Sequence, residues 1–387
     1  MNTTQQGILV LMKSAVTGEG LTLPEDFSLS RALPLIQAHH IIPLAYAGAV
    51  HCGLSLAESA MQQLLLRSGK LMLSAEKQMQ AIDSVLRAFQ EQGIDHMPVK
   101  GCLMKGRYPS PEMRPMGDAD ILIRMEQYDA IRPILMELGF VEELESDHEL
   151  IWKSPDLYLE LHKRLIPSYN RDYYAYFGDG WRLASQKNGC CHAMTQEDEY
   201  IYLFTHFAKH YRDGGIGCRH VLDLWVMDRW MTKPDREYIR RELKKLCLDR
   251  FHDNMKRVMD HWFEGGASDD VTELISQFIL TSGSWGGMET HVLSMEARKT
   301  KASGSKTRAL IHSVFPPARA LENKYRILKR WRWMLPLVWV WRWIRTVLYE
   351  RSHIRSTVRK LNVIDREAVD LYQRSLNAVG LEFRFEE

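Results

Sequence analysis

Apolar residues recur at helical spacing through the first quarter of the chain. The pattern predicts helices over residues 7–92, and within 55–92 apolar positions three and four residues apart form one continuous face. Pro34 and Pro43 are expected to break the helical stretch, and Gly93 is expected to end it. An apolar face of this length is typical of a packed core, which we favour over a cofactor-binding helix.

The pattern then changes to one that predicts strands. Residues 118–123 are rich in branched apolar side chains, and residues 157–161 alternate strictly between polar and apolar. Residues 140–143 and 149–153 add two strands, antiparallel to the last and joined by polar turns, and 126–138 is expected to be a helix. A mixed sheet with helices beside it is an α+β arrangement.

Beyond residue 165 the pattern is less regular. Residues 166–190 are loop-rich and aromatic, and the rings either form a stacking wall for a base or pack a domain junction, which we favour. Helical patterns return from residue 197, and 299–307 has the composition of a polar linker. We therefore expect an N-terminal helical region (1–93), a catalytic core (94–190), a helical domain (191–298), and a linker followed by a basic, Trp/Arg-rich helical region (299–387).

The strand at 118–123 carries the first candidate chemistry. Asp118 and Asp120 share one face because strand side chains alternate, and Glu160 would add a third carboxylate from a neighbouring strand. Carboxylates this close repel one another unless a cation neutralises them, and oxygen ligands are those that Mg²⁺ prefers. A spacing of two between aspartates is also common on solvated strands, so Glu160 is what favours a two-metal cluster for phosphoryl or nucleotidyl transfer.

A second candidate element precedes this strand. A short strand ends at Lys100, and Gly101 is expected to begin a helix whose backbone N–H groups, with Lys100 beside them, suit a phosphate chain. Arg114 is a further candidate for phosphate contact. Gly117 marks a tight turn into the strand that carries Asp118.

Three motifs together carry a resemblance to a known family. Val-Lys-Gly at 99–101, Arg-Pro-Met-Gly-Asp-Ala-Asp at 114–120 and Leu-Glu-Leu-His at 159–162 resemble the bacterial uncharacterised nucleotidyltransferase family of the DNA-polymerase-beta-like superfamily. The resemblance covers roughly residues 30–250. It implies a polymerase-beta-like core flanked by helical regions, with Asp118, Asp120 and Glu160 as catalytic metal ligands. The chain has Lys100-Gly101 where Gly-Ser is usual, which bears on how the triphosphate is bound.

The resemblance also implies a function. We expect an enzyme that uses Mg²⁺ or Mn²⁺ to transfer a nucleotidyl group from an NTP to a hydroxyl acceptor such as a sugar phosphate, a protein or tRNA. Kinase-like phosphoryl transfer from the same site remains an alternative, as does a non-catalytic nucleotide-binding module of a toxin–antitoxin or surface-polysaccharide system. The residues assigned to nucleotide binding are Lys100, Gly101, Arg114, Gly117 and His162.

A polar set follows in the helical part of the chain. His206 and His210 are four residues apart on one helical face, and Arg219 and Asp223 follow. This histidine spacing can bind a metal, but the acidic residue of a helical metalloprotease motif is missing between them. Family members show a similar His, His, Arg, Asp set. It forms either a network facing the cleft or a buried structural network.

Charge is distributed unevenly along the 387 residues. The net charge is +2, but residues 324–360 alone carry +10, so the remainder carries −8. Five of the eleven tryptophans lie at 331–343 among these basic residues. Interleaved Trp and Arg suit a membrane surface with anionic lipid or a lipid-linked acceptor, while packing of the indoles on the enzyme is the alternative. Nucleic acid is the least favoured partner.

The remaining sequence features bear on the cellular compartment. Six cysteines occur without Cys-x-x-Cys spacing, which favours reduced thiols over zinc or a disulfide framework. The N-terminus does not have the basic and apolar pattern of a signal peptide, and no apolar run reaches 18 residues. We therefore expect a cytoplasmic protein, with peripheral contact to a membrane as a possibility.

Overall fold

The computed structural model describes residues 1–282, 315, 321, 325, 330–341 and 374–381. These fall into two compact units: the first holds residues 1–211, 215–285 and 379–381, and the second holds 212–214, 286–378 and 382–387. The catalytic elements expected from the sequence all belong to the first unit. The predicted linker at 299–307 lies outside the described residues.

Four helices begin the first unit: α1 (Thr3–Thr17), α2 (Leu29–Ala38), α3 (Ile42–His51) and α4 (Ser59–Glu91). The break expected at Pro43 is confirmed, because this proline stands in the first turn of α3, where no hydrogen bond from its nitrogen is needed. The break expected at Pro34 is wrong. This proline lies inside α2, whose apolar side chains on both sides of it, Ala32 and Ile36 among them, are fully buried and hold the helix together.

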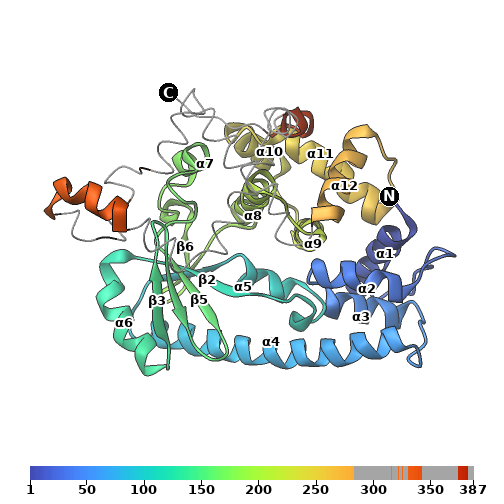
Figure 1. Ribbon diagram of the computed structural model, residues 1–387, viewed down its shortest axis with the longest axis horizontal. Coiled ribbons are helices and arrows are strands. Elements are labelled where there is room, and N and C mark those ends of the chain that lie inside the picture. The colour runs from blue at the N-terminus through green and yellow to red at the C-terminus, as the bar shows by residue number, and fades with distance from the viewer. Residues whose placement is uncertain (283–314, 316–320, 322–324, 326–329, 342–373, 382–387) are drawn as a thin grey trace. The chain divides into compact units, whose positions relative to one another are not determined.

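The long helix α4 joins the N-terminal helices to the sheet. Its N-terminal half packs against α2 and α3, and its C-terminal half lies along the sheet and α6 (Tyr128–Glu137) (Figure 1). The buried side chains of α4 follow one face, from Met61 to Phe89. The apolar stripe predicted for 55–92 is therefore core only in part, because Leu65, Leu71 and Leu73, which the pattern also placed on it, are exposed.

One mixed sheet of seven strands carries the predicted chemistry. Its order is β3-β4-β5-β2-β1-β7-β6, with β5 parallel to β2 and β1 antiparallel to it. The strands expected at 118–123 and 149–153 have those bounds, and the α+β class is confirmed. The strands are β1 (His96–Val99), β2 (Asp118–Ile123), β3 (Val141–Glu145), β4 (Glu149–Lys153), β5 (Tyr158–His162), β6 (Ser185–Asn188) and β7 (Cys191–Ala193).

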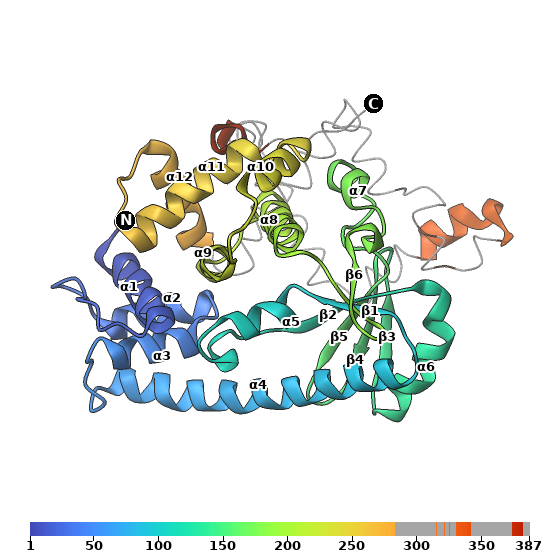
Figure 2. The same cartoon turned by 180° about the vertical axis from the view of Figure 1, so that it is seen from behind.

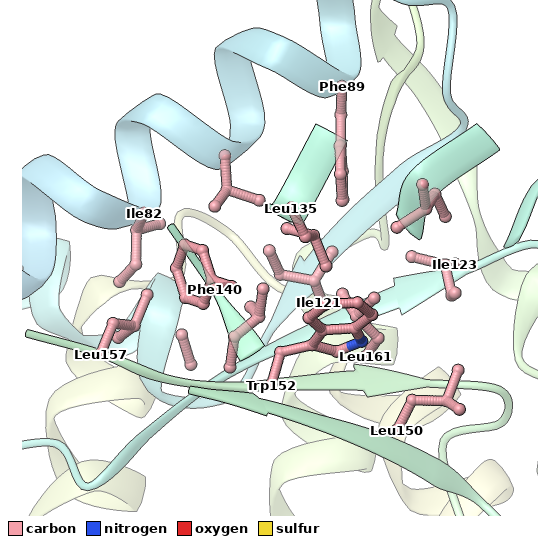
Figure 3. Close-up of a cluster of buried hydrophobic side chains, with 14 of the residues drawn as sticks. Ile82, Phe89, Ile121, Ile123, Leu135, Phe140, Leu150, Trp152, Leu157 and Leu161 are labelled. Carbon is pink, nitrogen blue, oxygen red and sulfur yellow. The ribbon is translucent and has the colours of Figure 1, made fainter. Parts of the chain in front are cut away.

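The two faces of the sheet differ in chemistry. Figure 3 shows the apolar face, where Ile121, Trp152 and Leu161 pack with Phe89 of α4 and Leu135 of α6. Because strand side chains alternate, this packing turns the intervening residues of β2 and β5 toward the opposite face. The core therefore fixes which side of the sheet can carry a site.

Helices α8 to α11 lie on the other side of β2 and α5 from α4, in both views (Figures 1 and 2). The stretch 166–190, expected to be loop-rich, contains a helix, a short 3₁₀ turn and strand β6, so that expectation is partly wrong. The remaining helices are α5 (Gly101–Met104), α7 (Arg171–Phe177), α8 (Gln196–Asp213), α9 (Cys218–Trp230), α10 (Arg236–Lys245), α11 (Asp249–Met259) and α12 (Asp270–Ser282).

Candidate active site

Three carboxylates converge on the polar face of the sheet because of the β2–β5 register. Asp120 lies directly opposite Glu160 in this parallel pair, and Asp118 precedes Asp120 on the same face. Asp118 and Glu160 are close enough to share a side-chain hydrogen bond. Asp120 is buried, and the other two are half-buried. The structure thus brings together the three residues that the sequence singled out.

Lys100 and His162 both contact one oxygen of Asp120. Lys100 Nζ donates to Asp120 Oδ1 at 2.7 Å, and His162 Nε2 lies 2.8 Å from the same oxygen. His162 Nε2 is also 3.6 Å from Glu160 Oε2 and 3.4 Å from Lys100 Nζ. Lys100, at the end of β1, therefore brings a positive charge into the carboxylate cluster.

The crowding drives the pKa values of the carboxyls apart. Burial, and then the charges of Asp120 and Glu160, raise the pKa of Asp118 to about 7. Burial also acts to raise the pKa of Asp120, but Lys100 and the hydrogen bond from His162 outweigh it and hold that pKa below its usual range. An acid that titrates near neutrality beside one that stays ionised is a pattern common at catalytic sites.

The donor set suits a divalent cation. One ligand atom from each of Asp120, Glu160 and His162 lies within 4.8 Å of the other two. A cation among the carboxylates would relieve the repulsion that raises the pKa of Asp118. In addition, the buried Nδ1 of His162 has no hydrogen-bond partner within the described part of the chain. Buried polar atoms are rarely left without a partner unless they bind a ligand.

Comparison with protein families gives a match over more than half of the chain. The family described as "Uncharacterised nucleotidyltransferase" matches residues 25–264, which hold the whole sheet and the helices from α2 to α11. The chain belongs to this nucleotidyltransferase family. The resemblance seen in the three sequence motifs is therefore confirmed.

Two further comparisons add little to the family assignment. A search of curated proteins found no match. Among solved structures, the solution structure of the antibiotic-resistance factor ANT(2'')-Ia is similar with a TM-score of 0.34 and 14% identity, and the match covers 46% of this chain and 98% of that one. A likeness at this level carries no weight beside the family match.

The turn before helix α5 has an unusual backbone conformation at Lys100. Lys100 has φ +49 and ψ −117, a backbone conformation natural to glycine and strained for any other residue. Glycine would therefore fit the turn better. Lysine at this position carries a backbone strain energy of about 1–3 kcal/mol, and its ammonium reaches Asp120.

Two substitutions separate the backbone of Lys100 from its charge. Lys100→Gly and Lys100→Ala both remove the ammonium, but only glycine accepts the positive φ without strain. We expect the glycine variant to have a free energy of unfolding about 1 kcal/mol higher than the alanine variant, measured by chemical denaturation. Equal unfolding free energies would show that the turn is not strained.

Arg114 has a buried carboxylate partner. Its Nε and Nη2 donate to the two oxygens of Asp223 on α9, each at 2.9 Å, and Tyr108 also donates its hydroxyl to Asp223 Oδ1 at 2.8 Å. Arg114, Asp223 and Tyr108 are all buried. Arg114 thus holds α9 to the loop before β2, and its predicted contact with phosphate would fall to Nη1.

The two predicted glycines differ in their surroundings. A Cβ on Gly101 would lie 2.8 Å from Met116 Sδ and 3.1 Å from Arg114 Nη1, so only glycine fits without a shift. Gly117 is exposed, and a Cβ there would meet open space. The close approach at Gly101 keeps the start of α5 tight against the loop that leads to Asp118.

Helix α8 carries a polar row facing this cluster. Tyr202, His206 and His210 recur at four-residue intervals, and Tyr202 hydrogen-bonds with Lys100. His206 Nε2 and His210 Nε2 are 3.1 Å apart. Burial is the main reason that the pKa of both histidines lies well below its ordinary value, and the charge of Lys100 contributes to each. The histidine pair therefore lies near the carboxylates as a neutral donor–acceptor pair.

Sequence reasoning missed several residues of this region. Tyr108 and Tyr202 are aromatic residues in helical or loop stretches, where nothing marks their hydroxyls as partners of Asp223 and Lys100. Lys105 is buried although lysine is rarely so, and no local pattern predicts that. The positive φ of Lys100 could have been inferred from the glycine that is usual at its position.

Proposed function

We propose that this protein is a metal-dependent enzyme that transfers a nucleotidyl group from an NTP to a hydroxyl acceptor. The observation that carries the proposal is the register of β2 with β5, which sets Asp120 opposite Glu160 with Asp118 beside them. The family assignment supports nucleotidyl transfer in general. The acceptor is one with a free hydroxyl, such as a sugar phosphate, a protein side chain or tRNA.

The reaction is an in-line displacement at the α-phosphorus of the NTP. The acceptor oxygen forms the new bond to phosphorus, the bond from the α-phosphorus to the bridging oxygen breaks, and pyrophosphate leaves with that electron pair. The proton of the acceptor hydroxyl passes to a carboxylate of the cluster.

Divalent metal fits the carboxylates of Asp120 and Glu160, whose ligand atoms lie within 4.8 Å of each other and of a nitrogen of His162, with Asp118 on the same face of the sheet. When bound there, Mg²⁺ or Mn²⁺ would supply positive charge that neutralises the phosphates as the transition state forms. The chain's own groups position the rest: Lys100 and the backbone of Gly101 lie beside the cluster where the phosphate chain would run. His162 holds Asp120 in orientation through its Nε2.

An isotope experiment tests the proposal directly. ATP labelled at the α-phosphate, or at the γ-phosphate, is incubated with the enzyme, Mn²⁺ and a panel of sugar phosphates, tRNA and the protein itself. Nucleotidyl transfer labels an acceptor from the α-position and releases pyrophosphate. Label transferred from the γ-position would instead indicate kinase-like chemistry, and no transfer with any NTP would favour a non-catalytic module.

We also propose that the Trp/Arg-rich segment brings this cytoplasmic enzyme to an anionic membrane surface or a lipid-linked acceptor. Within the second unit, Trp331, Trp333 and Trp341 are 47%, 67% and 60% exposed. Trp339 instead packs with Leu321 and Val338. In the described part of the chain no helix is both long enough and apolar enough to cross a bilayer. Much of the predicted basic segment at 324–360 lies outside the described residues.

Vesicle flotation distinguishes the exposed indoles from the packed one. The double change Trp333→Ala and Trp341→Ala should weaken binding to anionic vesicles without lowering the melting temperature. Trp339→Ala is the matched control, since it removes a packed indole and should lower the melting temperature. Wild-type binding should weaken as salt rises. Absence of wild-type flotation on anionic vesicles would end the membrane proposal.

A further inference from the structure

Basic side chains gather beside the loop that leads into β2. Lys105 and Arg114 are 1% and 6% exposed. Arg219, in the first turn of α9, donates a hydrogen bond to the carbonyl of Pro115 in that loop. These cations are close enough to act on one another: after burial, the charge of Arg114 is the main cause that lowers the pKa of both Lys105 and Arg219.

The carboxylate nearest to this group is already engaged. Arg114 occupies both oxygens of Asp223, and the hydroxyl of Tyr108 donates to one of them. Glu112 acts on Lys105 electrostatically, but its carboxylate accepts the hydroxyl of Ser110 and is only half-buried. Asp223 therefore forms its direct ion pair with Arg114. Asp223 and Asp118 also act on Arg219 through their charge, but burial and the charge of Arg114 outweigh them and lower the pKa of Arg219.

The hydrogen bonds of the other two cations are correspondingly incomplete. The acceptor for Lys105 Nζ is the carbonyl oxygen of Pro111, at 3.3 Å. The buried Nε of Arg219 has no hydrogen-bond partner among the residues that the structure describes. Arg219 as a whole is half-buried and Lys105 is buried. A buried guanidinium nitrogen without an acceptor, or a buried ammonium with one long hydrogen bond, is costly unless an anion completes its hydrogen bonds.

The end of the helix that carries Arg219 adds to the positive potential. Residues 218–221 of the first turn read Cys-Arg-His-Val, where the helix dipole would favour an acidic residue. The N-cap is Gly217, which has no side chain to cap the helix, and Gly215 before it has φ +126. A basic side chain at the N-terminal, positive end of a helix dipole is unfavourable alone and becomes favourable when an anion binds there.

The direction of the pKa shift distinguishes Arg114, which pairs with a carboxylate, from Arg219 and Lys105. Burial acts to lower the pKa of Arg114, but Asp223 outweighs it and the pKa is raised. The pKa of Arg219 is lowered, and that of Lys105 is lowered to about 8, in each case first by burial. The excess of positive charge therefore lies on Arg219 and Lys105. Arg219 also acts electrostatically on Asp118, so this excess lies within reach of the carboxylate cluster.

We propose that Arg219, supported by Lys105 and the N-terminal end of α9, binds a phosphate group of the substrate, namely the pyrophosphate part of the NTP. The identity of that phosphate rests on the proposed nucleotidyl transfer, whereas the existence of the anion site does not. The sequence pattern alone assigns no role to Arg219. The structure gives it an unsatisfied nitrogen and a position next to the loop that delivers Asp118.

Calorimetric titration with inorganic pyrophosphate in EDTA tests the site without metal or turnover. Arg219→Gln should weaken binding about 10- to 100-fold, because a charged hydrogen-bond donor is lost. Arg229→Gln is the matched control, since this arginine lies at the other end of α9 with its side chain 57% exposed, and its affinity should equal that of the wild type. Failure of the wild type to bind, or equal binding by both variants, overturns the proposal.

Two additional measurements test whether Arg219 lacks a compensating charge and which phosphate compound binds there. Without added anion, Arg219→Gln should melt close to the wild type, because removal of a poorly compensated cation offsets the lost hydrogen bond to the Pro115 carbonyl; a much lower melting temperature would show that the chain already compensates Arg219, and would overturn the site. Tighter binding of glycerol 1-phosphate than of pyrophosphate would overturn the assignment to the NTP in favour of a phosphorylated acceptor. Pyrophosphate binding without any NTP turnover would count against the proposed function alone.

Discussion

Asp120→Asn should abolish nucleotidyl transfer, with a loss of about 1000-fold or more, and should remove the stabilisation that Mn²⁺ with ATP gives to the wild type. Asp120 is the buried member of the carboxylate cluster and is held ionised by Lys100 and His162. The amide keeps the shape of the carboxylate but not its charge, so metal affinity is lost, and Lys100 loses its ionic partner at some cost in stability. Thermal melting with and without Mn²⁺ plus ATP measures the effect on binding.

The control for this prediction is an aspartate outside the cluster. Asp156 lies in the turn before β5 with its side chain 49% exposed, and Asp156→Asn should behave like the wild type in both assays. The melting temperature of Asp120→Asn without ligand reports whether the fold survives. If Mn²⁺ and ATP stabilised Asp120→Asn as much as the wild type, the assignment of the metal site would be wrong.

Replacing Asp223 should have the largest effect on stability. Asp223→Ala would leave the guanidinium of Arg114 buried without its carboxylate, and removing one partner of a buried pair typically costs about 3–5 kcal/mol of unfolding free energy. Chemical denaturation measures this loss. The double variant Arg114→Met with Asp223→Leu should recover a large part of it, because no unpaired charge remains.

An exposed ion pair provides the comparison. Glu143 pairs with Lys153 across β3 and β4 with both side chains more than 40% exposed, and Glu143→Gln should cost less than about 1 kcal/mol. A loss for Asp223→Ala as small as that for Glu143→Gln would show that Arg114 is not committed to Asp223. Arg114 would then be free for the phosphate contact expected from the sequence.

The carboxylate cluster could be predicted because its determinants are local. Alternation within β2 fixes that Asp118 and Asp120 share a face, and alternation within β5 does the same for Glu160 and His162. The three motifs then identified the family. Only the pairing of the two strands had to be supplied, and their parallel register puts Asp120 opposite Glu160.

The rest of the site depends on contacts between distant parts of the chain. Arg114 and Asp223 are 109 residues apart, and nothing near either one indicates the partner. The backbone strain at Lys100 depends on the turn between β1 and α5, and the lysine itself does not indicate it; only the glycine expected at this position could have done so. The strands β6 and β7 were missed because they are only four and three residues long and largely solvent-accessible, so they lack the alternation that predicts a strand.

The single long helix α4 has a consequence for how this enzyme could be cut or recombined. Its 33 residues span about 50 Å, supporting α2 and α3 with one half and the sheet core with the other. From its middle, Gln78 Nε2 also donates to the carbonyl of Met116, two residues before Asp118. A fragment beginning at residue 94 would expose the apolar face of the sheet on which Val85 and Phe89 pack. The sheet is therefore not expected to fold as an independent unit without α4. Insertions and fusions are better tolerated outside the helix, at the turn near Gly53.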